Sequence, residues 1–372
     1  MRPTYLPSTL NDGTPGSPFK LEFPVYFGKE TRSNQTIIST GRFDYVTPTI
    51  HNPNFYDGKN PNYSGSINNY FVAKTFNFNN YVPNFLGGNT NALVPMLRLS
   101  YVFDRIADFT GYTFTGDFFA AVWYADLILY NTYPVELYLG ITDIFNTDIN
   151  WKNHVPDVSI GQFLTEIARM FCLGISIRQT SKTVEMFFNK SLLDNSISFV
   201  NWSAKEVRRK GIGMADTKNQ VLKYADDLNY FADDGSRFFA EVVESGGFAD
   251  RDENVLQIGT LAYELGNGVT DGFKPARDEQ KGNSVSAQYE IGNQNPIPFR
   301  LLLWQGLQDD GTGKLVPTAS AVDVDGNAPI ALTIDGAKGL AASVWVEWLR
   351  YKLNRRAADK AFLLTATDYA TL

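Results

Sequence analysis

The chain of 372 residues has few of the side chains that most often carry chemistry: one cysteine, Cys172, and two histidines, His51 and His154. A single cysteine excludes a disulfide framework within the chain. Its position in the apolar run RMFCLG predicts a small buried hydrophobic residue. Neither histidine has a second metal-ligating residue at close spacing, which argues against a zinc site. Both are expected to have a surface or loop role.

Common catalytic motifs are also missing. The sequence contains no G-x-S-x-G, no GxGxxG and no GxxxxGK[ST]. It therefore lacks the turns that present a nucleophilic serine or cradle phosphates. The stretch GIGMAD at 211–216 has two glycines but no third, and it is predicted to be a turn.

Carboxylate pairs remain as candidates, because a glycosidase needs only two carboxylates. Acidic neighbours occur as Asp226–Asp227, Asp233–Asp234 and Asp309–Asp310, and Asp323 and Asp325 lie in the run AVDVDGN. Neighbours in sequence point apart, and AVDVDGN lacks the twelve-residue pattern and terminal glutamate of a calcium loop. Solvated turn residues are predicted, so no catalytic, cofactor-binding or metal-ligating residue is assigned.

Positive charge and long apolar runs are scarce as well. The net charge is −7, which argues against a protein that coats nucleic acid, because phosphate binding needs clustered Lys and Arg. No window approaches the ~18 apolar residues of a membrane-spanning helix. The N-terminal stretch MRPTYLPSTLNDG lacks the apolar core of a signal peptide. A soluble protein made in the cytoplasm is expected.

Two segments that begin as a helix and end as extended chain are the main positive signal. In the first, residues 91–117, apolar spacing predicts a helix over about 95–109 with Gly111 as its stop. The run YTFTG then predicts a short strand. A second, aromatic-rich helix is expected near residues 117–130.

The other segment spans residues 158–189. Ser159 is predicted to cap a helix with Gln162 as its capping-box partner, and Gly174 is expected to end that helix. The apolar face is predicted to contain Ile160, Phe163, Leu164, Ile167, Ala168 and Phe171. The runs ISIRQ and TVEMFFN then alternate around a turn at 180–182, which predicts a hairpin.

The flanking regions are expected to be rich in strands. Strands are predicted within 21–90, at 237–244, at 298–306 as a buried strand, and at 361–372. A long exposed loop is expected at 271–292, and a final helix at 338–354 with a basic C-terminal end. The turn-forming residues of 51–65 predict a loop. Its aromatic side chains, Phe55, Tyr56 and Tyr63, look exposed from the sequence, as does that of Trp151. They could stack on sugars, anchor an interface or belong to the core.

The order of these motifs resembles tail-tip hub proteins of tailed phages and prophages, especially those of Bacteroidetes-like hosts. The matching pieces are NALVPMLRLSYVFDRIADFTGYTFTG, VSIGQFLTEIARMFCLGISIRQTSKTVEMFF, PFRLLLWQG and KGLAASVWVEWLRY, within about residues 90–370. The N-terminal arm is covered less well. The resemblance implies an α+β, β-rich fold, with two tube-type β-barrel domains and an inserted α+β domain.

The resemblance also implies an assembly. Three subunits would form a ring that adapts a six-fold tail tube to a three-fold tip and surrounds the DNA channel, without sequence-specific binding of DNA. Expected partners are the tail tube, distal tail proteins, the tape measure and tip spike or fibre proteins. The expected location is the virion tail, after synthesis in the host cytoplasm.

On this plan the chain divides into an extended arm (1–20), a first barrel (21–95 with 196–245), an inserted domain (96–195) and a second barrel (246–372, with the helix at 338–354). The arm and the loop at 51–65 are the candidate interface segments. No C-terminal lytic module is expected, hence no enzyme activity and no cofactor. The alternatives are a surface carbohydrate-binding protein, which aromatic, Asn-rich loops would suit, and a glycoside hydrolase.

Overall fold

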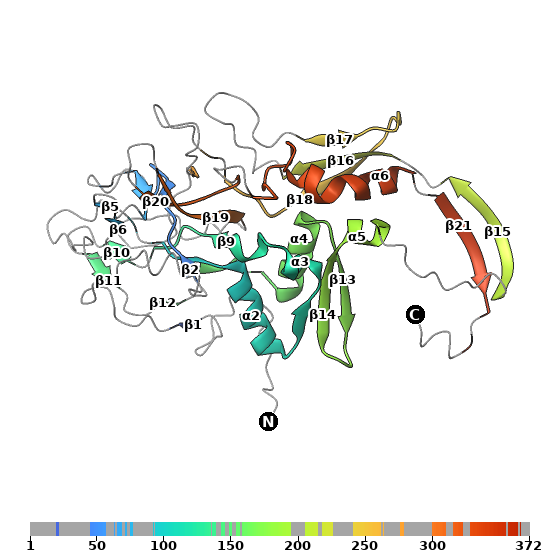
Figure 1. Ribbon diagram of the computed structural model, residues 1–372, viewed down its shortest axis with the longest axis horizontal. Coiled ribbons are helices and arrows are strands. Elements are labelled where there is room, and N and C mark those ends of the chain that lie inside the picture. The colour runs from blue at the N-terminus through green and yellow to red at the C-terminus, as the bar shows by residue number, and fades with distance from the viewer. Residues whose placement is uncertain are drawn as a thin grey trace.

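The structure is a computed structural model (Figure 1). It describes residues 45–56, 63, 65–68, 92, 94–134, 154–156, 158–194, 205–214, 218–225, 241–261, 263, 276–278, 300–309, 315–322, 328–354, 356–363 and 365, and the strand segments 20–21, 71–72, 75–76, 136–138, 143–145 and 149–150. Over this part of the chain the fold is mixed α+β, and strands predominate over helices.

The helices lie mainly in the middle of the chain and near its end. They are α2 (Leu99–Thr110), α3 (Asp117–Ala120), η2 (Tyr124–Asp126), α4 (Ile160–Met170), α5 (Asn189–Asp194), the π-helical turn η6 (Ala341–Trp345) and α6 (Val346–Asn354). Among the residues described, no helix is both long enough and apolar enough to cross a membrane.

Three sheets have three strands each. They are β20-β19-β9 (Leu315–Ser320, Arg300–Asp309, Leu127–Tyr130), β13-β14-β8 (Leu173–Arg178, Thr183–Phe188, Thr113–Thr115) and β17-β16-β18 (Val242–Glu244, Asn219–Tyr224, Arg251–Leu256). Two of them contain one parallel pair each, β14 with β8 and β16 with β18.

The remaining strands form antiparallel pairs. The longest is β15 (Glu206–Met214) with β21 (Arg356–Phe362). The others are β1 (Lys20–Leu21) with β12 (Ile149–Asn150), β2 (Tyr45–Val46) with β7 (Met96–Leu97), β3 (Ile50–His51) with β4 (Ser66–Ile67), β5 (Phe71–Val72) with β6 (Thr75–Phe76), and β10 (Glu136–Tyr138) with β11 (Asp143–Phe145). None of the sheets formed by the described residues closes into a barrel.

The larger hydrophobic core joins residues from Leu97 to Leu349. It brings α2, α4, the β13–β14 hairpin and the η6–α6 helix together. A smaller core lies around β19 and includes Phe55, Tyr130 and Trp304. The division into an arm, two barrels and an inserted domain stays a prediction, and residues 1–19 of the arm lie outside the described residues.

The first predicted helix is confirmed over most of its length. Its apolar face is buried at Leu99, Val102, Phe103 and Ile106. Gly111 ends it in the left-handed conformation, with φ 69°, and donates its N–H to Ala107 O at 2.7 Å, as a C-terminal glycine does. The helix begins at residue 99 rather than 95, because residues 96–97 instead pair with β2 as strand β7.

The prediction of a second helix over 117–130 was wrong. Only α3 and the short η2 are helical, and Leu127–Tyr130 forms strand β9 against β19. All four residues of β9 are buried. A short apolar run that is buried on both faces shows neither helical nor strand periodicity, so its pattern does not distinguish a strand from a helix.

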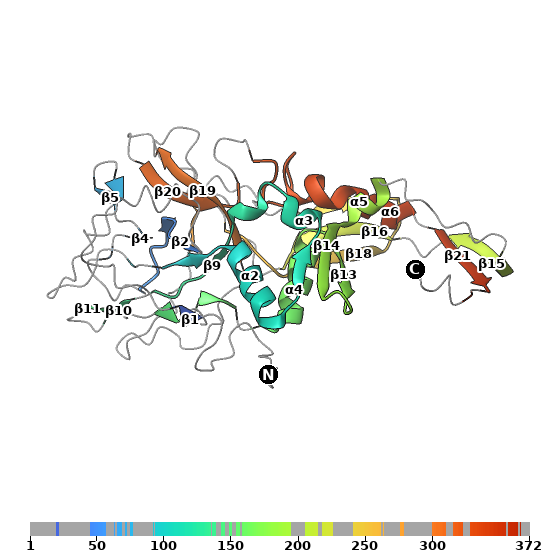
Figure 2. The same cartoon turned by 60° about the horizontal axis from the view of Figure 1, so that its bottom comes forward.

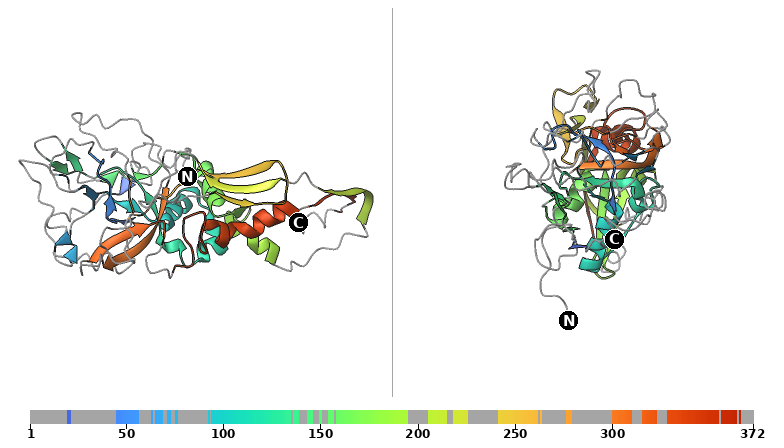
Figure 3. Two further views of the ribbon diagram at one scale, coloured as in Figure 1. Left: turned by 90° about the horizontal axis from the view of Figure 1, so that it is seen from above. Right: turned by 90° about the vertical axis from the view of Figure 1, so that its left-hand side faces the viewer.

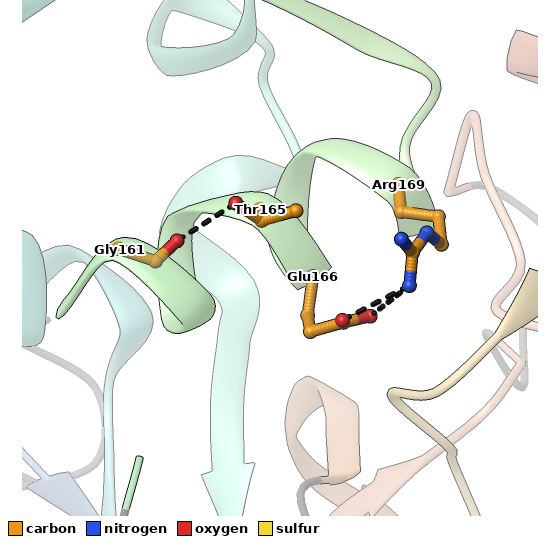
Figure 4. Close-up of polar contacts among 4 residues, drawn as sticks. All are labelled: Gly161, Thr165, Glu166 and Arg169. Carbon is orange, nitrogen blue, oxygen red and sulfur yellow. Dashed lines mark hydrogen bonds and ion pairs between the residues drawn. The ribbon is translucent and has the colours of Figure 1, made fainter. Parts of the chain in front are cut away.

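Helix α4 starts as predicted, with Ser159 Oγ accepting from Gln162 N at 3.1 Å. Its predicted face lies against the core, and its opposite face is polar (Figure 4). There Thr165 Oγ1 donates to Gly161 O at 2.8 Å, and Arg169 lies 3.0 Å from Glu166. Gly174 does not end the helix, which stops at Met170. Cys172 takes the positive φ, 53°, at the turn.

Gly174 belongs instead to β13, in the hairpin that the sequence predicted. A side chain there would place Cβ 2.4 Å from Cε2 of Phe187, directly across the strand pair. Close cross-strand packing, not helix termination, is therefore the reason for glycine at this position.

The C-terminal helix agrees with its predicted position, and Leu340, Val344, Trp345 and Leu349 are buried. The strand predicted at 361–372 is displaced: β21 ends at Phe362, and residues 366–372 lie outside the described part. The prediction of a turn at GIGMAD (211–216) was wrong for its first four residues. Gly211 to Met214 belong to β15 and pair with Asp359 to Arg356 of β21.

Candidate functional site

The histidines that sequence analysis placed in loops differ in their surroundings. His154 is buried, and its Nδ1 lies 3.2 Å from Asn131 Oδ1. Asn131 donates Nδ2–H to Pro95 O at 2.7 Å, and its Oδ1 also accepts from Tyr133 N. Asn131 Oδ1 is therefore an acceptor, and His154 carries its proton on Nδ1. Burial lowers the pKa of His154 to about 3, which keeps the imidazole neutral.

His51 takes part in a second buried polar arrangement through its backbone. His51 N donates to Ala276 O at 3.0 Å, and Asp278 N donates to His51 O at 2.9 Å. The prediction of an exposed loop over 271–292 was therefore wrong for residues 276–278, because Ala276 and Asp278 are fully buried. The rest of that predicted loop lies outside the described residues.

Asp278 also joins two strands of the β20-β19-β9 sheet. Arg300 Nη1, on β19, lies 3.7 Å from Asp278 Oδ1, and both side chains are buried. Tyr130, on β9 and paired with Arg300 across the sheet, donates its hydroxyl to Asp278 Oδ2. This buried cluster connects β9 and β19 with residues 276–278, which lie far apart in the sequence. Its role is therefore structural.

Cys172 is buried, as the sequence predicted. Burial raises the pKa of its thiol to about 12, and the side-chain hydrogen bond from Asn189 opposes that shift only in part. A thiol with a raised pKa is a poor nucleophile near neutral pH. Cys172 therefore acts as packing in the core.

Of the acidic residues weighed as carboxylate pairs, the structure describes only Asp309. Asp309 is exposed at the end of β19. The other weighed carboxylates lie outside the described residues: Asp226, Asp227, Asp233, Asp234, Asp310, Asp323 and Asp325. Within the described ranges, no three His, Cys, Asp or Glu side chains are grouped so that they could hold a metal ion.

Within the loop at 51–65, the structure describes residues 51–56, 63 and 65. Phe55 and Tyr56 are buried in the smaller core, and Tyr63 packs edge-on against Tyr56 at 4.9 Å between ring centroids. Tyr63 also donates its hydroxyl to Asn52 O. Of the alternatives left open by the sequence, the structure therefore supports a core role for Phe55 and Tyr56, and Trp151 lies outside the described residues.

A cavity of about 540 Å³ opens beside a bulge in β19. The register of β19 against β20 shifts between Trp304 and Leu307, and such bulges redirect side chains at sites. The walls combine indole rings, a carboxylate and amides from separate segments, chiefly Trp123, Asp126, Trp304 and Gln305. Val122, at 78% exposure, is the most exposed large hydrophobic side chain among those described.

The ribbon formed by β15 and β21 is the other feature that stands apart. It forms a two-stranded sheet, with no third strand among the described residues on either edge. Figures 1, 2 and 3 show it beyond α6, clear of the other labelled elements. Sequence analysis missed it because the strands are about 150 residues apart in sequence, and no local pattern couples them.

Comparison of the chain with models of protein families, with curated protein sequences and with solved structures gives no match. The cavity and the ribbon are surfaces suited to contact with a partner.

Proposed function

We propose that this protein is a structural subunit of a phage tail-tip or baseplate hub. Three copies would form a ring that adapts the six-fold tail tube to the three-fold tip and surrounds the DNA channel. The observation that carries the proposal is the long β15–β21 ribbon, which projects beyond α6 and has no third strand on either edge among the residues described. An isolated two-stranded ribbon is at best marginally stable in water, so it suits a subunit that is completed by its neighbours.

The rest of the fold is compatible with that role. The described part of the chain is strand-rich, and its sheets are small, with outer strands that a neighbour could extend. Helices α2 and α4 and the β13–β14 hairpin supply the helical middle that the hub plan requires. The finer plan, two tube-type barrels around an inserted α+β domain, is part of the proposal.

The proposed partners are two further copies of the chain, the tail tube, distal tail proteins, the tape measure, and spike or fibre proteins at the tip. The proposed location is the virion tail. The role is architectural, so the purified protein should not clear a peptidoglycan suspension. Clearing of the suspension would show a lytic activity that this role does not include.

Carbohydrate binding, the main alternative, loses part of its support because Phe55 and Tyr56 are buried. A glycan array tests it directly. Electron microscopy of the purified protein tests the hub. Three-fold rings with a central hole are expected, alone or after addition of the tail tube protein. Single compact particles under both conditions, together with glycan binding, would favour the alternative.

A further inference from the structure

The far end of the β15–β21 ribbon carries two exposed apolar side chains beside the charged residues Lys205 and Glu206. Glu206 pairs with Phe362 there, and Leu363 N donates to Lys205 O at 3.0 Å. The two neighbouring large hydrophobic side chains are strongly exposed, Val207 at 66% and Leu363 at 74%. Val207 is the additional residue of a β-bulge between Glu206 and Arg208. Two strongly exposed apolar side chains at the end of a projecting ribbon suit a contact with another molecule.

The ribbon also continues from a helix that is packed on the body of the protein. Strand β21 begins two residues after α6, and α6 is fixed on the β17-β16-β18 sheet. Lys352 donates to Asn254 Oδ1 at 2.9 Å and lies 3.0 Å from Asp252, while Leu349 is fully buried. Helix α6, from which the chain continues into the ribbon, is therefore packed on the body of the protein.

The charge of the ribbon favours its own chain as partner. Its two strands contain five basic residues against Glu206 and Asp359: Arg208, Arg209, Lys210, Arg356 and Lys360. The ribbon thus has a net charge of +3, and because the whole chain carries −7, the remainder carries −10. Asp126, the charged residue among those that line the cavity beside β19, has the opposite sign to the ribbon, and opposite charges steer two surfaces together and suppress wrong partners.

The cavity beside β19 is a hollow of suitable size for the tip of the ribbon. Its rim bears Val122, its walls include the indoles of Trp123 and Trp304, and Asp126 supplies a carboxylate. A volume of about 540 Å³ lies in the range of ~300–1,000 Å³ of pockets that bury a drug-sized ligand, so two aliphatic side chains fit. The ribbon lies at one end of the molecule and β19 away from it (Figures 2 and 3), so one chain does not fill its own cavity.

We propose that the tip of the ribbon, Val207 with Leu363, docks into the cavity around Val122 on a second copy of this chain. A projection on one face that meets a hollow on another makes a head-to-tail contact, which closes into a ring when the rotation allows. This inference rests on the proposed function for the ring itself, and it names the interface that would build it.

The first test is a mixed cross-link between two singly substituted chains, Leu363→Cys and Val122→Cys. The native Cys172 is buried with a raised thiol pKa, so it stays outside the reaction. Mild oxidation should give a disulfide-linked pair of chains in the mixture but in neither sample alone. Mixing Leu363→Cys with Ile177→Cys, a residue exposed on β13, is the matched control and should give none.

The second test is the mass in solution of the double variant Val207→Asp/Leu363→Asp. A carboxylate forced into an apolar contact should raise the subunit dissociation constant by more than ~10-fold. Val243→Asp is the matched control, because Val243 is also an exposed valine on a strand, at 39%, away from the tip and the cavity. That control should leave the mass unchanged, and circular dichroism of each variant checks its fold.

Three results would overturn the inference, and they separate it from the proposed function. If rings persist in the double variant and the mixed cross-link does not form, the proposed hub function is retained and this interface is refuted. A monomeric wild type without the cross-link at every concentration, with the tail tube protein absent and present, would count against both. Unchanged mass combined with duplex DNA binding that Arg208→Gln/Arg209→Gln abolishes would assign the ribbon to nucleic acid instead.

Discussion

Trp345 donates its indole Nε1–H to the carbonyl oxygen of Met170 at 3.0 Å, across 175 positions of sequence. Met170 is the last residue of α4, where helix carbonyls lack partners within the helix. The bond therefore satisfies a carbonyl at a helix end and holds η6, and with it the start of α6, against the middle of the chain.

Trp345→Phe should lower the free energy of unfolding by about 1–3 kcal/mol, because a buried carbonyl loses its donor while most of the ring packing stays. Trp345→Ala should cost about 3–5 kcal/mol through the added cavity. Urea unfolding measures both. Trp348→Phe is the control, since Trp348 is only partly buried; an equal loss in the control would refute the special role of the Trp345 bond.

His154 predicts a pH dependence of stability. Its pKa in the folded protein is lowered to about 3, whereas an unfolded histidine titrates near 6.5. Above pH 6.5 both states hold a neutral ring, so the contribution is constant. Between about pH 6.5 and 3 only the unfolded state binds the proton. Stability should then fall by up to ~1.4 kcal/mol per pH unit.

The variant His154→Gln removes this titration while retaining a donor for Asn131 Oδ1. Unfolding curves at several pH values should show a shallower loss of stability in the variant between pH 6.5 and 4. Identical slopes for the two proteins would mean that His154 is protonated in the folded state, contrary to its burial.

The buried pair of Asp278 and Arg300 predicts strong coupling. Asp278→Asn or Arg300→Met alone should lower the free energy of unfolding by about 3–5 kcal/mol, because each change leaves a buried charge without its counter-ion. The double variant should lose clearly less than the sum. Additive losses in a double-mutant cycle would show that the two side chains act independently.

Gly116 should not tolerate a side chain. Its φ is 115°, and an added Cβ would lie 2.1 Å from the carbonyl oxygen of Met186 on β14. Gly116→Ala is expected to destabilise the fold by about 1–3 kcal/mol or more. Gly161→Ala is the control, because open space surrounds that helical position and alanine there should stabilise by about 0.5–1 kcal/mol. Equal effects at both positions in thermal unfolding would contradict the close approach.

The elements that the sequence predicted correctly are those defined by local signals. The Ser159 cap, the apolar face of α4 and the alternation of the β13–β14 hairpin are each encoded within a few residues. The same holds for Gly111 at the end of α2.

The features that were missed depend on partners far away in the sequence. Strand β9 differs from a helix only because β19 lies beside it, and Asp278 is buried only because Arg300 and Tyr130 surround it. The ribbon and the cavity, which carry the functional argument, both arise from such long-range contacts.

The central claim is that copies of this chain assemble into a three-membered ring. Light scattering of the purified protein over a range of concentrations measures this most directly, with the tail tube protein absent and then present. The account predicts a particle with three times the chain mass of 41.6 kDa. A mass of one chain at every concentration, under both conditions, would contradict it.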